Sequence, residues 1–350
     1  MLCCSECFSS TYLKEIINSN HSIGDCDFCG TTEIATYDPK ELALFFRNIF
    51  DLYKIDFKVG NSIEIQIEND FQGKIFSSKI NTNRKQLLNE IVADDFNIYK
   101  RLFKGKVVLK HISNPIKSSQ AKPLQISWGK FAEEIKSTNR FHIQNALDLS
   151  KLRHLLNRYV RHIPKGKKYY RARISENIDG YKIGDMKNPP PEKAKAGRAN
   201  PIGISYLYIA NDIKTTIYEA RASLFDYVTV GDFRLKEDIK VINLRGDTYD
   251  PIKLAENEEL EDFLIHLPFI TKLEQELSKP RRRSDNELDY LPTQYLSEFI
   301  KSMDFDGVEF QSSLYPFGYN LAIFNPTKFE CIKVAVYEIE NIDLNHKKVS

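Results

Sequence analysis

The residues whose types are best suited to binding or catalysis form a short basic strand. Residues 169–174 read Tyr-Tyr-Arg-Ala-Arg-Ile, and their alternation predicts a strand with Arg171 and Arg173 on one face. Two guanidiniums on one face suit a phosphate or pyrophosphate, because each is permanently charged and offers a planar fork of donors. A solvated edge strand is the plain alternative, and the spacing by itself favours neither interpretation.

A turn, a strand and a helix follow. Residues 197–203 read Gly-Arg-Ala-Asn-Pro-Ile-Gly, a turn whose glycines let the backbone approach a ligand closely. Residues 206–210 predict a buried strand, and Asn211 or Asp212 is expected to cap the next helix. Glu219 lies beside the apolar side of that helix. It has no lysine or arginine four residues further on, so no helical ion pair explains it.

The N-terminus carries a metal-ligand spacing. Five of the six cysteines fall within the first 29 residues, and two Cys-x2-Cys pairs are separated by eighteen residues. This spacing predicts one structural zinc site with four thiolates, with Cys3 as a spare thiol and His21 as a weaker substitute ligand. Redox-active thiols are the alternative, which a reducing cytoplasm disfavours. The predicted ligands are Cys4, Cys7, Cys26 and Cys29.

Composition narrows the function classes. The chain has 350 residues, enough for two domains, and its formal net charge of +2 gives no global attraction to nucleic acid or to an anionic membrane. Its apolar runs are much shorter than a membrane span, and its first residues lack the pattern of a signal peptide. We therefore expect a cytoplasmic protein.

The remaining elements indicate the α+β class: a mostly helical N-terminal region with a zinc knuckle, then a mixed split-sheet domain. Neither a Gly-x-Gly-x-x-Gly turn nor a phosphate-binding Gly-x4-Gly-Lys loop is present, so the motifs of a Rossmann oxidoreductase and of a phosphate-loop ATPase are missing. Helical periodicity predicts helices at 38–53, 86–92, 128–136, 147–160, 251–277 and 288–303. Alternation predicts strands at 62–67, 225–233 and 239–244, and a strand flanked by lysines within 100–112.

The order of these motifs resembles the RES domain family, named for its Arg, Glu and Ser. The resemblance covers roughly residues 168–336 and includes the stretches 306–313 and 320–324. It implies a bacterial toxin, often one of a toxin–antitoxin pair, that degrades NAD and has a fold similar to ADP-ribosyl-transferring toxins. The N-terminal region resembles the HEPN/RES N-terminal domain. The implied domains are a knuckle at 1–35, the helical domain at 36–162 and the RES domain at 163–340.

Carried over residue by residue, the resemblance implies that Arg171, Glu219 and Ser312 are catalytic. Arg173 and Ser313 are their rivals by position, and a single sequence does not exclude them. The family's pocket tyrosine commonly precedes the Gly-Arg turn, where Lys195 and Ala196 stand here. Tyr181 or Tyr208 is then expected to pack against the nicotinamide or ribose. Arg198 is expected to assist with phosphate, and Asn320 to brace the wall behind Ser312.

The resemblance implies cleavage of the nicotinamide–ribose bond of NAD. ADP-ribosyl transfer to a macromolecule is the second hypothesis. The third is a binding module for nucleic acid or a partner, with an inactive RES-like half. An antitoxin or immunity protein and self-association are expected as further partners. The Arg and His spacing used by HEPN ribonucleases is missing, because Arg158 and His162 are too close in sequence.

Overall fold

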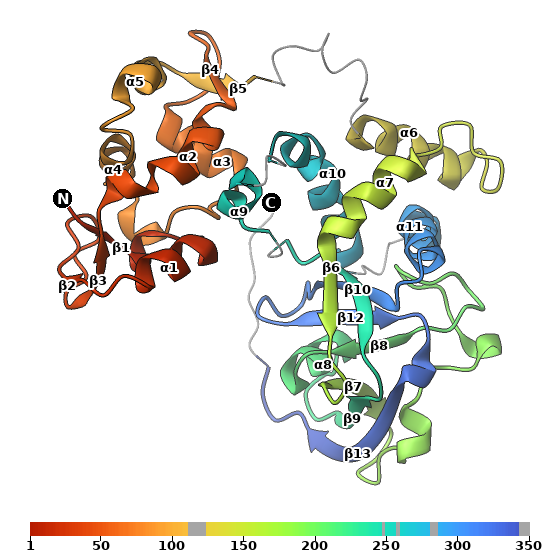
Figure 1. Ribbon diagram of the computed structural model, residues 1–350. Coiled ribbons are helices and arrows are strands. Elements are labelled where there is room, and N and C mark those ends of the chain that lie inside the picture. Colours follow the sequence, from red (N-terminus) through yellow and green to blue (C-terminus); the bar gives the residue numbers. More distant parts are fainter. Residues whose placement is uncertain (111–123, 247–248, 257–259, 281–285, 343–350) are drawn as a thin grey trace, which may run out of the picture. The chain divides into compact units, whose positions relative to one another are not determined.

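The structure is a computed structural model that describes residues 1–110, 124–246, 249–256, 260–280 and 286–342 (Figure 1). Its internal contacts divide the chain into two units. The first unit contains residues 1–123 and 249–267, and the second contains residues 124–248 and 268–350. The domain limits expected from the sequence, 1–35, 36–162 and 163–340, are defined by family resemblance, and this division by contacts does not test them. They stay a prediction.

The first unit combines short helices with two small sheets. Its described helices are α1 (Thr11–Asn18), α2 (Ala43–Phe50), α3 (Ile63–Asp70), α4 (Arg84–Ile91), α5 (Phe96–Lys104) and α9 (Pro251–Glu256). Within the described residues, one sheet has the order β1 (Cys3–Cys4), β3 (Ile34–Tyr37), β2 (Ile23–Gly24), and the other pairs β4 (Tyr53–Ile55) with β5 (Val107–Leu109).

The carboxylate of Asp250 links α9 to α1 in the first unit, although α9 comes late in the sequence. Asp250 accepts hydrogen bonds from the Ser10 hydroxyl at 2.8 Å and from the backbone N–H groups of Tyr12 and Ile252, both at 3.0 Å. These donors belong to the first turns of α1 and α9 and to the cap of α1. Because a carboxylate is favoured at a helix N-terminus, Asp250 joins both helix starts.

One of the two strands predicted in this unit is wrong. Residues 62–67 alternate isoleucine with polar residues, yet they lie in α3. Ile63 and Ile67 are buried four residues apart, whereas Ile65 has an exposed fraction of 47%. This is the spacing of one helical face. The strand predicted within 100–112 is confirmed as β5, which lies between Lys106 and Lys110, although α5 occupies this stretch up to Lys104; residues 111 and 112 lie outside the described ranges.

The second unit contains the large sheet. Its strands are β6 (Val160–Ile163), β7 (Lys168–Ser175), β8 (Leu207–Ala210), β9 (Tyr227–Leu235), β10 (Ile239–Asn243), β11 (Gly307–Gln311), β12 (Tyr319–Ile323) and β13 (Phe329–Glu338). Across the described residues, these eight strands have the order β13-β9-β7-β8-β12-β11-β10-β6. All neighbours are antiparallel except the parallel pair β10–β11. The combination of helices and a mixed sheet confirms the α+β class.

Helices α6 (Leu124–Ser137), α7 (Leu149–Leu156), α8 (Ile213–Ala220) and α11 (Leu291–Ser302) belong to this unit, and α10 (Leu260–Ser278) enters it at Pro268. Helix α7 is shorter than predicted. Asp148 caps its start, but residues 157–159 form a tighter turn and the chain then enters β6. Among the described residues, no helix combines the length and apolar character needed to cross a membrane.

Strands β7 and β8 are paired over a much shorter length than β7 and β9. Strand β7 pairs with β9 along its whole length, from Lys168 to Ser175, whereas β7 and β8 share only the pair Tyr170 and Ala210. Helix α8 packs against β7 and β8 at this joint (Figure 1). The fold therefore brings together the helix that carries Glu219, the strand that carries the arginine pair and the strand that carries Tyr208.

Candidate functional site

A pocket of about 400 Å³ lies beside the joint between β7 and β8. Its walls come from β7, β8, α8, the turn that precedes β8, the end of α10, and strands β11 and β12. All of these lining residues belong to the second unit, and the volume is typical of small-molecule sites. The charged residues among the described lining are Arg171, Arg198, Glu219, Arg221 and Lys279.

Helix α8 carries Glu219 to the edge of this pocket. Asp212 caps the helix, as one of the two predicted caps, by accepting hydrogen bonds from the backbone N–H of Thr215 at 2.8 Å and from its hydroxyl at 2.6 Å. One turn along, the hydroxyl of Thr216 accepts from the backbone N–H of Ala172 at 2.8 Å and fastens α8 to β7. Glu219 therefore leaves the last turn of α8 with its side chain exposed at the pocket.

Two neutral side chains hold the Glu219 carboxylate. The Ser312 hydroxyl donates to Oε1 at 2.6 Å, and the Asn320 amide donates to the same oxygen at 2.8 Å. Both donors are buried, and the Ser312 oxygen in turn accepts from the backbone N–H groups of Leu314 and Tyr315. Ser313 lines the pocket without a contact of this kind to Glu219 among the described residues. Of the two rival serines, Ser312 is the one that the structure places against the acid.

Arg171 lies in the opening between the two strands. Its side chain lines the pocket, and its nearest acceptor is the backbone carbonyl of Tyr208 in β8, a long contact of 3.5 Å from Nη1. Among the described residues, its buried Nε has no hydrogen-bond partner. Burial, together with the charge of Arg173, lowers the pKa of Arg171 to about 10, which leaves it protonated at neutral pH. A half-buried guanidinium at a pocket, with a buried Nε that lacks an acceptor among the described residues, is a group that an anion could complete.

Arg173 and Tyr181 contact each other rather than the pocket. The Arg173 guanidinium lies 4.0 Å from the centroid of the Tyr181 ring and donates to the backbone carbonyl of Asp185. Neither residue is part of the pocket lining. Arg171 and Arg173 do share one face of β7, as alternation predicts, but only Arg171 stands where the sheet opens.

The glycine-containing turn is held from inside by Asn200. Its amide donates to the backbone carbonyls of Lys195, Pro201 and Ile204, and its oxygen accepts from the Tyr208 hydroxyl at 2.7 Å. A Cβ on Gly197 would lie 2.5 Å from the Asn200 oxygen and 2.9 Å from the Tyr208 hydroxyl, so the turn needs glycine there. Tyr208 therefore serves the pocket wall while its hydroxyl braces this turn.

Arg198 projects from the same turn toward the end of α10. Its guanidinium lies 4.8 Å from the centroid of the Tyr290 ring and donates to the carbonyls of Glu276 and Pro280, both at 3.3 Å. Both of these acceptors are neutral carbonyl groups. Arg198 lines the pocket together with Tyr208, Glu219 and Asn320.

Comparison with protein families places these residues in context. The sequence model described as "RES domain" matches residues 168–345, which is half of the chain and includes every pocket-lining residue named above. The chain belongs to the RES domain family. No curated protein matches it. Among solved structures, a chain from the crystal structure of the M. tuberculosis MbcT–MbcA toxin–antitoxin complex is similar at 12% identity. The match covers 52% of this chain and 91% of that one, with a TM-score of 0.31.

The RES domain pocket also contains residues that the sequence did not single out. Arg221 and Lys279 add positive charge, and Gln311 and Tyr290 add polar surface. Lys279 follows α10, and no local sequence pattern could show that the end of this helix lies at the pocket. Arg221 had a detectable signal, because it directly follows a predicted helix where glycine is the usual residue.

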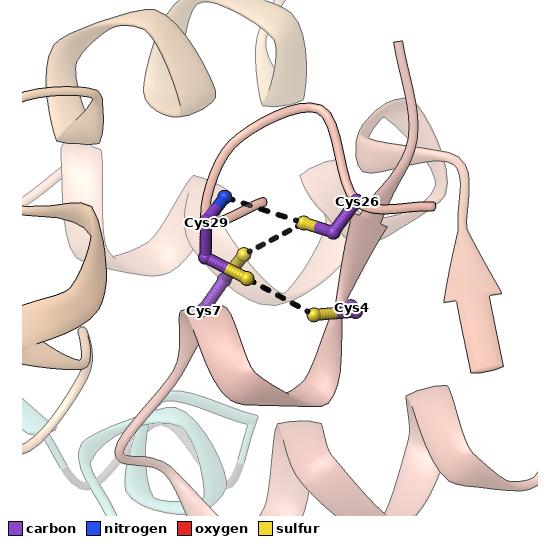
Figure 2. Close-up of side chains that lie close together, drawn as sticks. All are labelled: Cys4, Cys7, Cys26 and Cys29. Carbon is purple, nitrogen blue, oxygen red and sulfur yellow. Dashed lines mark hydrogen bonds between the residues drawn. The ribbon is translucent and has the colours of Figure 1, made fainter. Parts of the chain in front are cut away.

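Four cysteines of the first unit form the predicted cluster (Figure 2). The sulfur of Cys4 lies 3.4 Å from that of Cys29, and the sulfur of Cys7 lies 3.3 Å from that of Cys26. All four sulfurs lie within 4.8 Å of one another. Four thiolates around one zinc ion at about 2.3 Å would stand about 3.8 Å apart, so this set is close to the required tetrahedron.

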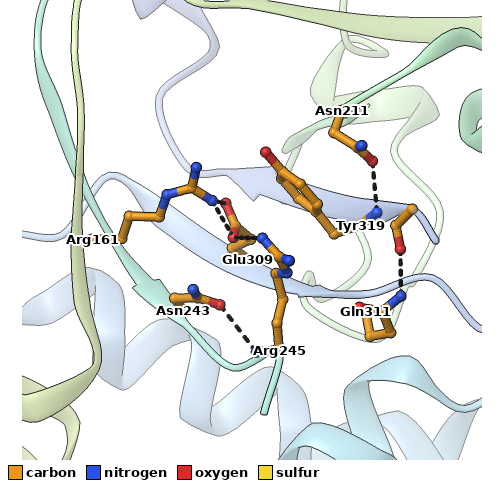
Figure 3. A network of polar contacts seen from close by, with 8 residues as sticks. Arg161, Asn211, Asn243, Arg245, Glu309, Gln311 and Tyr319 are labelled. Atoms are coloured by element: carbon orange, nitrogen blue, oxygen red, sulfur yellow. Dashed lines mark hydrogen bonds and ion pairs between the residues drawn. The ribbon is translucent and has the colours of Figure 1, made fainter. Parts of the chain in front are cut away.

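A second polar cluster of the RES domain surrounds Glu309 (Figure 3). Glu309 is fully buried in β11, and its carboxylate accepts from Arg161 at 2.5 and 2.7 Å and from Arg245 at 3.1 Å. The Arg245 guanidinium also lies 4.0 Å from the centroid of the Tyr319 ring. Glu309 itself is not part of the pocket lining, whereas its neighbour Phe310 and the cross-strand partner of Phe310, Asn320, are.

Proposed function

We propose that the RES domain of this chain cleaves the nicotinamide–ribose bond of NAD. The observation that carries the proposal is the Glu219 carboxylate, which is held at the pocket by the neutral donors Ser312 and Asn320 and has no ion-pair partner among the described residues. Its negative charge is therefore oriented but not neutralised. Such a group can stabilise a positive charge that develops in a bound substrate.

The reaction needs such a group. As the bond between the ribose C1′ and the nicotinamide nitrogen breaks, its electron pair leaves with nicotinamide and the ribose acquires oxocarbenium character. Water then adds to C1′ and loses a proton, which yields ADP-ribose. Glu219 stabilises the positive charge and accepts a hydrogen bond from a ribose hydroxyl, and Ser312 and Asn320 fix its orientation.

The charges of the pocket suit the rest of the substrate. Its described lining carries four cationic side chains and one acid, whereas NAD carries a pyrophosphate between its two nucleosides. Arg171 is the first choice for a phosphate contact, because its buried Nε lacks a partner among the described residues. Arg198 assists from the turn. Tyr208 forms the aromatic wall, whereas Arg173 and Tyr181 contact each other beside the pocket.

Incubation of the purified protein with NAD tests this proposal. Equal amounts of free nicotinamide and ADP-ribose are expected. Label from an adenine-labelled NAD that becomes attached to protein or nucleic acid would instead support ADP-ribosyl transfer, the second hypothesis. If NAD is unchanged at high enzyme concentration, the pocket is a binding site only and the proposed reaction is wrong.

The cysteine cluster is proposed to hold one structural zinc ion. The four sulfurs fit the ion in number, chemistry and spacing, and a closed four-thiolate shell leaves no open position for catalysis. Protein purified without chelator should contain one zinc atom per chain, and Cys26→Ser should lose it while Cys331→Ser keeps it. Wild-type protein free of zinc would refute this assignment.

We further propose that the toxin works in the cytoplasm, where NAD is abundant, and is restrained there by an antitoxin or immunity protein. A cell that makes an enzyme against such a common cofactor needs a protein that blocks it. Expression of the wild-type chain alone should stop bacterial growth, and Glu219→Gln should restore it. Size-exclusion chromatography of the purified variant determines whether the chain self-associates.

A further inference from the structure

The turn between β11 and β12 carries the serine that holds the acid. Residues 312–318 connect the two strands, and Gln311 and Tyr319 form the strand pair directly before this turn. The turn begins with Ser312, whose hydroxyl donates to Glu219 at 2.6 Å. Because the direction of that hydroxyl depends on the backbone at residue 312, the groups that fix the turn also affect the orientation of the acid.

The side chain of Gln311 closes this turn. Its amide Nε2 donates to the backbone carbonyls of Pro316 and Gly318, both at 2.7 Å. The carbonyl of Gly318 also accepts from the backbone N–H of Ser312 at 2.9 Å. One acceptor therefore receives both the side chain of Gln311 and the backbone of the serine that follows it. A glutamine amide has two hydrogens, and both are donated within the turn.

The turn is also in close contact with the helix that carries Glu219. The Tyr315 ring stacks on the Tyr218 ring of α8, with ring centroids 5.4 Å apart and an interplanar angle of 14°. A Cβ on Gly318 would lie 1.8 Å from the hydroxyl oxygen of Thr215 in the same helix, so only glycine fits at this contact. The amide of the glutamine therefore stabilises a turn that is packed directly against α8.

We propose that Gln311 is a positioning residue for the reaction, because it holds the turn that directs the Ser312 hydroxyl at Glu219. This inference rests on the proposed function. Gln311 also lines the pocket, so a direct contact with substrate is the alternative. The two roles have different consequences. A substrate contact acts on NAD binding and is independent of Ser312, whereas a positioning residue acts through Ser312 and changes turnover.

Gln311→Met tests the role, because methionine has a similar length and donates no hydrogen bond. The kcat should fall roughly 3- to 10-fold, no more than in Ser312→Ala, while the KM for NAD changes by less than about twofold. In the Ser312→Ala background the same substitution should cause no further loss, because the hydroxyl through which Gln311 acts is absent. Gln275→Met is the matched control, since Gln275 is an exposed residue of α10 that does not line the pocket.

Hydrogen exchange tests the order of the turn without the reaction. The backbone N–H groups of Ser312, Leu314, Tyr315 and Gly318 all donate to acceptors within residues 312–318. Gln311→Met should raise their exchange rates roughly tenfold or more, whereas exchange in β13 should be unchanged. Exchange in the turn at the wild-type rate would overturn the proposal.

The kinetic measurements decide the proposal in the same way. A raised KM with an unchanged kcat would make Gln311 a substrate contact. A full additional loss of kcat in the Ser312→Ala background would show that Gln311 acts independently of that hydroxyl. An unfolded Gln311→Met variant would make the glutamine a structural residue only. Each of these results would overturn the positioning role.

The outcome for Gln311 is distinguishable from the outcome for the reaction. If the wild-type chain leaves NAD intact, the proposed function fails, and hydrogen exchange still decides whether Gln311 orders the turn. If the wild-type chain cleaves NAD and Gln311→Met has the same kcat, the reaction stands and only the role of Gln311 is wrong.

Discussion

Glu309 lies in strand β11, and Glu219 accepts a hydrogen bond from Ser312, the residue directly after that strand. The two acids differ in the groups that hold them. Glu309 is fully buried and contacts two guanidiniums, from Arg161 and Arg245. Glu219 is exposed at the pocket and contacts a serine and an asparagine. The two acids therefore differ in that the charge of Glu309 is paired with cations, whereas Glu219 is held by neutral donors.

The surroundings explain this difference. Burial raises the pKa of Glu309, and the charges and hydrogen bonds of Arg161 and Arg245 oppose that rise. Its charge is thus paired with Arg161 and Arg245, and these ion pairs join β11 to β6 and to the segment after β10. The hydrogen bonds to Glu219 orient its carboxylate without neutralising it. On this physical basis we assign Glu309 to the stability of the domain and Glu219 to chemistry.

The largest expected effect comes from unpairing the buried acid. Arg161→Ala removes two short contacts to Glu309 and leaves a buried carboxylate with one cation, so the unfolding free energy of the second unit should fall by about 3 kcal/mol. Urea unfolding measures it, with Arg234→Ala, which breaks an exposed pair with Glu330, as the matched control. A loss below about 1 kcal/mol would mean that Glu309 does not need its second partner.

The same residue shows that the large sheet extends beyond the residues matched by the family model. Arg161 lies in β6, before residue 168, where the match begins, and β6 pairs with β10. The sheet and the Glu309 cluster therefore both include residues that precede the match.

Glu219→Gln addresses the other side of the comparison. The amide has the shape of the carboxylate and lacks its charge, so turnover should fall by roughly two or more orders of magnitude while NAD affinity stays nearly constant. Nicotinamide release and calorimetry measure the two quantities. Glu298→Gln, an exposed acid on α11, should change neither. Normal turnover in Glu219→Gln would make Glu219 a solvated helix residue.

Arg171→Lys is expected to have a smaller effect. Lysine keeps the positive charge and loses the planar fork, so turnover at low NAD concentration should drop roughly tenfold in a folded protein. Circular dichroism verifies the fold, and Arg173→Lys is the matched control, because Arg173 contacts Tyr181 beside the pocket. If the Arg173 variant loses activity and the Arg171 variant does not, the two roles are exchanged.

Local pattern was sufficient for much of this site. Strand β7, the cap at Asp212 and the helix that carries Glu219 follow from alternation, capping chemistry and periodicity. Local pattern failed at residues 62–67, where alternating isoleucines fit a strand and a helix face equally well and tertiary packing decided. It could not reveal the Glu309 cluster, because the partners of Glu309 lie 148 and 64 residues away in the sequence. Nor could local pattern show that the pairing of β7 with β8 ends next to Arg171, since this depends on the relative course of the two strands.

The smallest expected effect distinguishes the two rival serines. Ser312→Ala removes one of the two donors to Glu219 and leaves Asn320 in place, so the acid loses orientation but keeps its charge. The kcat should fall roughly tenfold, with little change in KM, because one hydrogen bond to a charged group is lost. The backbone N–H groups of Leu314 and Tyr315 also lose their acceptor, which should cost about 1 kcal/mol of stability.

Ser313→Ala is the control, and it should leave kcat and stability unchanged, since Ser313 is exposed and makes no contact with Glu219 among the described residues. A larger loss of kcat for Ser313→Ala than for Ser312→Ala would assign the family's serine to the hydroxyl that lines the pocket. The neutral donors around Glu219 would then have only a structural role. The contrast with Glu309 would rest on exposure alone, because both acids would be held by groups that serve the fold.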